Sequence, residues 1–309
     1  MIDITQIPFE LGLVEAALTH GQQLYVRTSD EVAHVAVDGI VTVLHTFDAQ
    51  SPLAFKGLVL VGDDLMTIDR PLGATPILTS VSLQGEVERY PAVPLHHPSG
   101  LTVLAGQPVV SDQQPPLTKF LLGTAGARVP VDARNLTHWE VSGDELVYSD
   151  AIGLHQGHPT NPRTVMKRTG ILTFDLAGHC VIQKLEEGRS VFEVVSAGTS
   201  RTVTEVNRPA ALHRLSGETF VRFRNQIAPA LMPDALETLP KATDLGTVAE
   251  VCGGLSYLDD DRQLRWSADG IYWKTFEPAI RASDVVPVNE LELVLTGRRA
   301  SAWVRSAAP

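Results

Sequence analysis

Apolar residues along the chain occur in short runs separated by turn residues, and they rarely recur at the three-to-four spacing of an amphipathic helix. The segment GLVLVGDDLMTID, residues 57–69, is typical, because two apolar runs flank Gly62, Asp63 and Asp64. A β-rich run, a glycine-centred turn and a second run predict a β-hairpin. The pattern therefore predicts an all-β chain built from hairpins.

The hairpin pattern repeats. Seven hairpins have turn glycines at Gly21, Gly62, Gly106, Gly143, Gly198, Gly253 and Gly297. Their successive separations are 41, 44, 37, 55, 55 and 44 residues, which is the period range of four-stranded propeller blades. A second hairpin follows most of them, with turns at Gly39, Gly85, Gly178, Gly217 and Gly270. Two hairpins per period predict a four-stranded antiparallel meander.

We therefore predict one β-propeller domain over residues 1–309, with seven four-stranded blades and six as the alternative count. The last period is incomplete, and the N-terminal strand is expected to pair with the C-terminal blade and close the propeller, which leaves no exposed sheet edge. The two 55-residue periods are interpreted as long loop insertions at about 150–168 and 225–246. Two stacked β-sandwiches are the competing architecture, but they give no reason for this period.

One hairpin carries a characteristic turn sequence. RWSADGIYWKTF contains Ser267, Asp269, Gly270 and Trp273, and it resembles the Asp-box of sialidase-like propellers with one residue fewer between Asp and Gly. The aspartate is expected to accept backbone N–H groups, the glycine to take a positive φ, and the tryptophan to pack beneath the turn. The resemblance implies a structural turn between the third and fourth strands of a blade, and it identifies no specific family.

Composition restricts the partners. Lys plus Arg total 25 against 36 for Asp plus Glu, and the net charge of −11 repels phosphate backbones and anionic lipid headgroups. Neither nucleic acid nor a membrane is therefore expected as the partner. The N-terminal sequence has no basic start followed by an apolar run, and no stretch of about 18 apolar residues occurs. A cytoplasmic location is expected.

In a meander, the turns between second and third strands and the connections between blades lie at one face. The long segments are expected there, and long loops on a rigid scaffold commonly carry binding residues. The candidate binding residues are the polar side chains of these segments: His96, His97, Asp112, Asp150, His155, His158, Arg163, Asp259 and Asp260. Asp150, His155 and His158 are also candidate ligands for calcium or zinc, although solvated loop residues are the simpler interpretation and no cofactor is predicted.

Two functions follow from this pattern. The favoured one is a non-enzymatic intracellular scaffold that binds a protein or peptide on the loop-rich face, because the chain has no phosphate loop, zinc-helix motif or nucleophile elbow. The alternative resembles gluconolactonase-like propellers, which are metal-dependent lactonases or esterases with a divalent ion at the central channel. Its ligands would come from Glu10 or Glu15, from Asn135, Asn161 or Asn207, and from Asp150, although FELGLVEA replaces the Glu-Gly-Pro start of that group.

Overall fold

A computed structural model describes the chain over residues 4–50, 57–158, 161–167, 171–175, 180–187, 189–196, 199–206, 211–215, 218–223, 225–229, 237–242 and 247–306. These residues form strands and turns and contain no helix. A helix long and apolar enough to cross a membrane is accordingly not found in this part of the chain. The predicted all-β class is confirmed.

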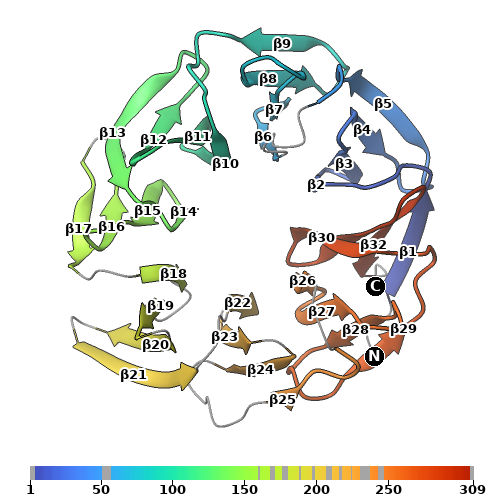
Figure 1. The fold of residues 1–309 in the computed structure, drawn as a ribbon. Coiled ribbons are helices and arrows are strands. Elements are labelled where there is room, and N and C mark those ends of the chain that lie inside the picture. The colour runs from blue at the N-terminus through green and yellow to red at the C-terminus, as the bar shows by residue number, and fades with distance from the viewer. Residues whose placement is uncertain are drawn as a thin grey trace. The chain divides into compact units, whose positions relative to one another are not determined.

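The chain divides into two compact units. Unit 1 comprises Met1–Pro8 and Arg168–Pro309, and unit 2 comprises Phe9–Lys167. The described strands of each unit form four sheets of four strands. Figure 1 shows that the first strands of the four sheets in unit 2 lie on one side of that unit and the fourth strands lie on the other.

The four sheets of unit 2 are antiparallel meanders in chain order. The first contains β2 (Ala16–His20), β3 (Gln23–Arg27), β4 (Glu31–Val35) and β5 (Val41–Thr46). The second contains β6 (Leu58–Val61), β7 (Asp64–Asp69), β8 (Ile77–Ser82) and β9 (Val87–Tyr90). The third contains β10 (Pro98–Leu104), β11 (Gln107–Gln114), β12 (Leu117–Leu122) and β13 (Ala127–Arg134). The fourth contains β14 (His138–Ser142), β15 (Glu145–Ser149), β16 (Leu154–Gly157) and β17 (Arg163–Met166).

Three sheets of unit 1 follow the same order, and the fourth takes a strand from the N-terminus. The first contains β18 (Ile171–Asp175), β19 (Cys180–Glu186), β20 (Arg189–Ser196) and β21 (Thr199–Val206). The second contains β22 (Ala211–Leu215), β23 (Glu218–Phe223), β24 (Gln226–Pro229) and β25 (Glu237–Thr238). The third contains β26 (Ala249–Val251), β27 (Gly254–Leu258), β28 (Leu264–Ser267) and β29 (Lys274–Phe276). The last contains β30 (Asp284–Asn289), β31 (Glu292–Thr296), β32 (Ser301–Ser306) and β1 (Ile4–Phe9).

The N-terminal strand β1 is hydrogen-bonded to β32 as the fourth strand of the last sheet. The predicted pairing of the N-terminal segment with the C-terminal strands is therefore present. Gln6 strengthens the attachment, because its Nε2 donates to the carbonyl oxygen of Glu277 at 2.8 Å and its Oε1 accepts from the amide of Ala279 at 2.7 Å. Both bonds fix the segment that leads into β30.

Burial is greatest in the second strand of a sheet and lowest in the fourth strand. The second strands β7 and β31 are buried at almost every position, whereas the fourth strands β9 and β17 are mostly exposed. Sheets cover the second strands on both faces, so these strands appear in the sequence as continuous apolar runs. The outer strands carry charged residues such as Glu88 and Arg89, which discourage pairing with another chain.

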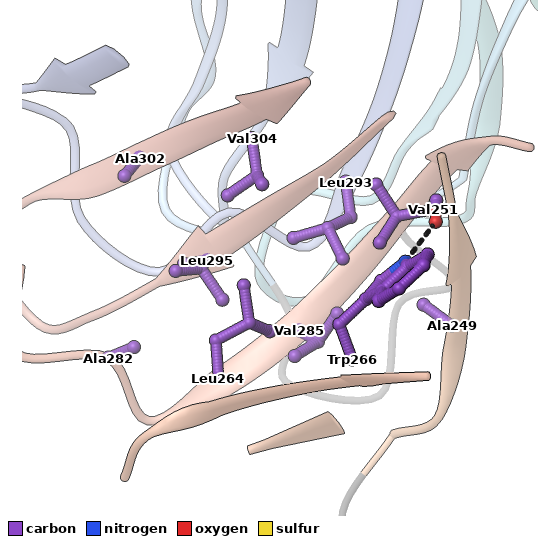
Figure 2. Close-up of a cluster of buried hydrophobic side chains, with 10 residues drawn as sticks. All are labelled: Ala249, Val251, Leu264, Trp266, Ala282, Val285, Leu293, Leu295, Ala302 and Val304. Carbon is purple, nitrogen blue, oxygen red and sulfur yellow. Dashed lines mark hydrogen bonds between the residues drawn. The ribbon is translucent and has the colours of Figure 1, made fainter. Parts of the chain in front are cut away.

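Apolar clusters join neighbouring sheets within each unit. One cluster in unit 1 lies between the sheets β26–β29 and β30–β32, with Trp266 at one side of it (Figure 2). The Trp266 indole N–H donates to the carbonyl oxygen of Val251 at 2.9 Å, so the buried ring has a partner for its only polar atom. First strands of successive sheets also contact each other, β2 with β6 and β6 with β10 in unit 2, and β26 with β30 in unit 1.

The sequence-based count of seven blades, or six, is too low for the described strands, which form eight four-stranded sheets. The two segments interpreted as insertions account for the difference. Residues 150–168 contain β16 and β17, and residues 225–246 contain β24 and β25, so both segments complete sheets. Glu237 and Thr238, which lie in the second of these segments, form β25. The predicted turn glycines Gly178, Gly198 and Gly217 lie outside the described residues.

The sequence did not predict β16, β17, β24 and β25, because these strands are short and weakly apolar. β16 and β17 have the sequences LHQG and RTVM, with Asn161 and Pro162 in the turn between them. β24 and β25 are QIAP and ET. β17 and β25 are outer, fourth strands, whereas β16 and β24 are third strands that contain buried residues. Such short strands take their conformation from pairing with the adjacent strand, so their local sequence carries a weak β pattern.

The close packing at Trp266 gives a test of this core. A Cβ atom at Gly254 would overlap the Trp266 indole and lie 2.6 Å from the carbonyl oxygen of Ser267. We expect Gly254→Ala to lower the free energy of unfolding by about 3 kcal/mol, since both backbone and ring must shift. Gly62→Ala is the control, because its Cβ meets open space and only the positive φ opposes it, at a cost of about 1 kcal/mol. Urea unfolding measures both, and equal effects would contradict the packing.

Candidate functional site

Each meander sheet has two ends. We call the end with the turns between second and third strands, together with the connections between sheets, the connection end, and the opposite end the hairpin end. In unit 2 the described connection-end turns are 28–30, 70–76, 115–116 and 150–153. In unit 1 the connection end includes the turns 259–263 and 297–300 and the connection 277–283. The candidate residues are described below unit by unit.

Asp112 in β11 fixes the connection that leads into β10. Its side chain is 0% exposed, and Oδ1 accepts the backbone amides of His96 at 2.9 Å and His97 at 2.7 Å. Oδ2 accepts from Nε2 of Gln114 at 2.9 Å. The carboxylate therefore offers no exposed oxygen to a ligand, and it holds the backbone that presents the exposed side chains of His96 and His97.

Asp150 fixes the next connection-end turn and also orients His155. Its Oδ1 accepts the amides of Ile152 at 2.8 Å and Gly153 at 3.1 Å, and it lies 2.8 Å from Nε2 of His155. Both side chains are buried, and the second ring nitrogen of His155 lies 3.2 Å from the hydroxyl oxygen of Thr164. The pair thus supports the backbone of a turn.

The aromatic ring of Tyr148 extends this buried group. It stacks on the His155 ring, with centroids 4.6 Å apart and planes 16° apart. Burial, with a smaller contribution from the nearby Asp150 carboxylate, raises the pKa of Tyr148 to about 12. Tyr148 therefore stays neutral at physiological pH.

His158 and Arg163 lie at the other end of the same sheet. They flank the turn between β16 and β17, which is a hairpin-end turn, and both are exposed. The sequence placed them with Asp150 on one loop-rich face, and that placement is wrong. The reason is that two strands run through residues 150–168, so the chain crosses the sheet between Asp150 and His158.

Asp259 in unit 1 has the same role as Asp150. Its side chain is 2% exposed, and Oδ1 accepts the amides of Asp261 at 3.0 Å and Gln263 at 2.9 Å. Oδ2 receives two contacts of 2.7 Å from the Arg265 guanidinium, which balances the buried charge. Asp260 is exposed on the turn that Asp259 holds.

Asp69 is a fourth aspartate of this kind and is absent from the residues predicted from the sequence. Asp69 ends β7, is 1% exposed and accepts from Nε2 of Gln50 at 2.8 Å. A shared pattern could have identified the set, because an aspartate lies at or near the end of an apolar second strand in MTID, VVSD, VYSD and SYLD. The turn beyond Asp69 carries Leu72, which is 70% exposed, and the turn beyond Asp150 carries Ile152, which is 55% exposed.

In the first sheet of unit 2, an arginine side chain takes the place of the aspartate at the end of the second strand. Arg27 ends β3 with 0% exposure, and its guanidinium donates to the carbonyl oxygen of Ile68 at 2.8 Å and to the hydroxyl of Thr67. The guanidinium also lies 4.8 Å from the ring centroid of Phe47. Burial lowers the pKa of Arg27 to about 10, with the Asp69 carboxylate among the groups that oppose the shift. Arg27 therefore remains charged at neutral pH and ties the first sheet to the second.

The predicted metal ligands do not gather around a common point in the part of the chain that the structure describes. No group of three or more His, Cys, Asp or Glu side chains suited to a metal occurs there. Asp150 and His155 bond to each other, and His158 lies at the other end of the sheet.

The turn between β28 and β29 has the local geometry expected of its sequence. Oδ1 of Asp269 accepts the amides of Ile271 and Tyr272, each at 2.9 Å, and the Ser267 hydroxyl lies 2.9 Å from the same oxygen. Gly270 has a φ of +74°, and Trp273 packs edge-on against Tyr257 with centroids 5.0 Å apart. The turn lies at the hairpin end and is structural in its contacts, while the resemblance to the Asp-box stays a prediction.

Comparisons with known proteins identify the fold and no family. No family model matches the chain, and no curated protein sequence matches it. The WD40 β-propeller domain of Doa1 is 10% identical, covers 99% of this chain and 98% of its own, and has a TM-score of 0.55. AztD from Citrobacter koseri is 12% identical, covers 96% and 90% in the same order, and has a TM-score of 0.56.

A third similar structure is the dihydro-heme d1 dehydrogenase NirN, 14% identical over 85% of this chain and 67% of that chain, with a TM-score of 0.56. At 10–14% identity, these propellers share only the arrangement of strands with this chain. Together with the four-stranded meander sheets, the likeness shows that the protein is a β-propeller, as the sequence predicts, of no identified family.

Removal of the buried Asp150 carboxylate tests the turn in unit 2. Asp150→Ala leaves the amides of Ile152 and Gly153 and the buried ring of His155 without their acceptor, so we expect the free energy of unfolding to fall by about 3 kcal/mol. Asp38→Ala is the matched control in the same unit, because Asp38 is exposed and accepts the amide of Ile40 at 3.1 Å. Its expected cost is about 0.5 kcal/mol or less. Urea unfolding that gave equal costs would refute the role of Asp150.

The Asp269 turn predicts a pH dependence. Acceptance of the Tyr272 amide, followed by the smaller effects of Ile271 and Ser267, lowers the pKa of Asp269 from its ordinary value of 3.8. Because the folded state favours the ionised form, its stabilisation is present above that ordinary pKa and is lost as the pH falls through the lowered value. We expect Asp269→Ala to cost about 1 kcal/mol or less at neutral pH, given the solvent exposure of the turn.

The stability difference between wild type and Asp269→Ala should therefore shrink between pH 7 and about pH 3. Thermal unfolding at the two pH values measures it. Asp269→Asn is the control, since its amide oxygen accepts a hydrogen bond but does not titrate. If the stability difference between the wild-type protein and Asp269→Ala were the same at both pH values, the charge of Asp269 would contribute nothing to stability.

Proposed function

We propose that this β-propeller is a non-enzymatic scaffold that binds a protein or peptide partner at the connection ends of its sheets. The observation that carries the proposal is Ile152, an exposed apolar side chain at the tip of a turn that a buried aspartate holds in one conformation. The β-propeller fold, shared with the WD40 domain of Doa1, is consistent with such a role.

Exposed isoleucine and leucine at fixed turns suit a binding surface for an energetic reason. Burial of such a side chain by a partner contributes about 1.5–3 kcal/mol. A loop that must become ordered loses part of this gain, whereas the Asp150 turn has its amides already bonded. Single exposed apolar residues are common on proteins, so the support lies in the combination of exposure with a rigid turn.

The turn that carries Leu72 shows the same combination. The Leu72 amide donates to the carbonyl oxygen of Ala49 at 2.7 Å, and the Arg70 amide donates to Oε1 of Gln50 at 2.9 Å. Gln50 also contacts the buried Asp69, so backbone, side chain and carboxylate fix this turn together. Two turns of unit 2 thus present apolar side chains from connection ends whose backbone is preorganised.

The test uses a matched pair of isoleucines. Ile152 and Ile40 are both exposed, at 55% and 63%, and the amide of each donates to an aspartate two residues earlier. Ile152 lies at a connection end, and Ile40 lies at a hairpin end of the same unit. Peptides are first selected from a displayed random library against the wild-type protein, and their affinities are then measured for Ile152→Ser, Leu72→Ser and Ile40→Ser.

We expect Ile152→Ser or Leu72→Ser to weaken selected peptides by about tenfold or more, which corresponds to the loss of one buried side chain. Ile40→Ser should leave the affinities within about twofold. Urea unfolding of all three variants separates lost binding from lost folding. Selected peptides that bind Ile152→Ser and Leu72→Ser as well as wild type, or that lose affinity equally for Ile40→Ser, would refute the proposal.

A further inference from the structure

A basic pocket lies at the connection end of unit 1. It has a volume of about 620 Å³ and is formed by the turns 259–263 and 297–300 and the connection 277–283. This size is typical of pockets that hold a small ligand or a few side chains. The lining residues are Arg262, Ile280, Arg281, Ala282, Ser283, Arg298, Arg299 and Ala300. Four of the eight are arginines and none is acidic, and we call this site the arginine pocket.

The charge of the arginine pocket contrasts with that of the chain. The protein carries a net charge of −11, yet four exposed guanidinium groups gather at one pocket. Arg262 donates from Nη1 to the carbonyl oxygen of Ser283 at 2.8 Å. Among the described residues, the side chains of Arg281, Arg298 and Arg299 form no ion pair or hydrogen bond. No acidic residue lines the pocket to offset the repulsion between these positive charges, so the pocket attracts an anion.

Close backbone packing brings the arginine-bearing segments together. A Cβ atom at Gly297 would lie 2.6 Å from the carbonyl oxygen of Arg281, so only glycine permits this approach of the turn 297–300 to the connection 277–283. The amide of Ser283 donates to the carbonyl oxygen of Thr296 at 2.7 Å, and the Ser283 hydroxyl lies 3.0 Å from the same oxygen. The positions from which Arg281, Arg298 and Arg299 extend are therefore fixed.

The third arginine-bearing segment is fixed separately. Asp259 holds the turn 259–263 through the two amides described above, and the amide of Arg262 donates to the Asp259 carbonyl oxygen at 2.9 Å. Arg262 has a φ of +63°, a conformation that costs a non-glycine residue energy and that the surrounding bonds maintain. On the other side, Gln6 of β1 holds the start of the connection at Glu277 and Ala279. The backbone of the pocket is thus preorganised.

We propose that the arginine pocket binds an acidic peptide segment of the partner through carboxylate or phosphate oxyanions. The proposal rests on the proposed function, because it assigns the chemistry of a second contact at a connection end. The planar guanidinium donates two parallel hydrogen bonds to such oxyanions. Ile280, Ala282 and Ala300 supply an apolar wall for the methylene groups of the same segment. A long nucleic acid is disfavoured, because the net charge of the chain repels it.

The experiment measures the binding of defined probes to the full chain. The probes are a fluorescent glutamate-rich peptide, the same peptide with phosphoserine in place of the glutamates, and the same peptide with glutamine. Arg298→Gln/Arg299→Gln is the pocket variant. Arg163→Gln/Lys167→Gln is the control, because both of its side chains are exposed in unit 2 and the change in net charge is the same.

We expect both acidic peptides to bind the wild type more tightly than the glutamine peptide. The pocket variant should lose about tenfold or more in affinity for them, and the control should stay within about twofold. Equal losses in both variants would show non-specific attraction and overturn the proposal. Inorganic phosphate that competes at the same concentration as the peptides would assign the pocket to a free anion, and tighter binding of a single-stranded oligonucleotide would assign it to nucleic acid. Either result would overturn the proposal.

The results that would contradict the arginine pocket differ from those that would contradict the proposed function. Ile152→Ser should bind the acidic peptides like wild type, because Ile152 belongs to unit 2 and does not line the pocket. Acidic peptides that bind through the arginines support the pocket even when library peptides are insensitive to Ile152 and Leu72. If library peptides depend on Ile152 but acidic peptides do not bind, the proposed scaffold function is supported and acidic-peptide binding in the arginine pocket is excluded.

Discussion

A buried carboxylate near the end of a second strand is the interaction on which the described connection ends depend. Asp69, Asp112, Asp150 and Asp259 each hold a turn or connection through hydrogen bonds with side chains or backbone amides. A turn of a few residues cannot satisfy its own amides, and an internal acceptor replaces the water that would otherwise bind them. The charge is tolerated because several donors converge on it, and in one case a guanidinium does so. Rigid turns at the connection ends follow from this arrangement.

Burial on both faces is the second constraint on the fold. A four-stranded sheet of this size cannot hide its own apolar surface, so neighbouring sheets share clusters such as the one around Trp266. The inner strands then become continuous apolar runs, and the outer strands are left with little apolar area to bury. This explains why the fourth strands β17 and β25 differ so much in sequence from β7 or β31.

The two proposed contacts have complementary chemistry. Unit 2 presents Leu72 and Ile152 on fixed turns, and unit 1 presents the arginine pocket, both at connection ends. Apolar anchors supply affinity, whereas arginines add selectivity for oxyanions. On this proposal, the net negative charge of the chain disfavours extended polyanions, and the arginine pocket binds a short acidic segment. The hairpin ends show tight structural turns such as the one at Asp269.

The amino-acid sequence by itself determined the all-β class, the four-stranded meander, the pairing of the N-terminal strand and the local geometry of the Asp269 turn. These features depend on short-range patterns, which are apolar alternation, turn glycines and side-chain bonds to nearby amides. The number of sheets, the positions of His158 and Arg163, and the burial of Asp112, Asp150 and Asp259 were decided only in the tertiary structure. Outer strands form by pairing with a neighbour, and polar residues become buried when their bonding partners arrive from elsewhere in the fold. The arginine pocket is the same kind of feature, since it combines three segments that are brought together by packing at Gly297 and by bonds from Gln6 and Asp259.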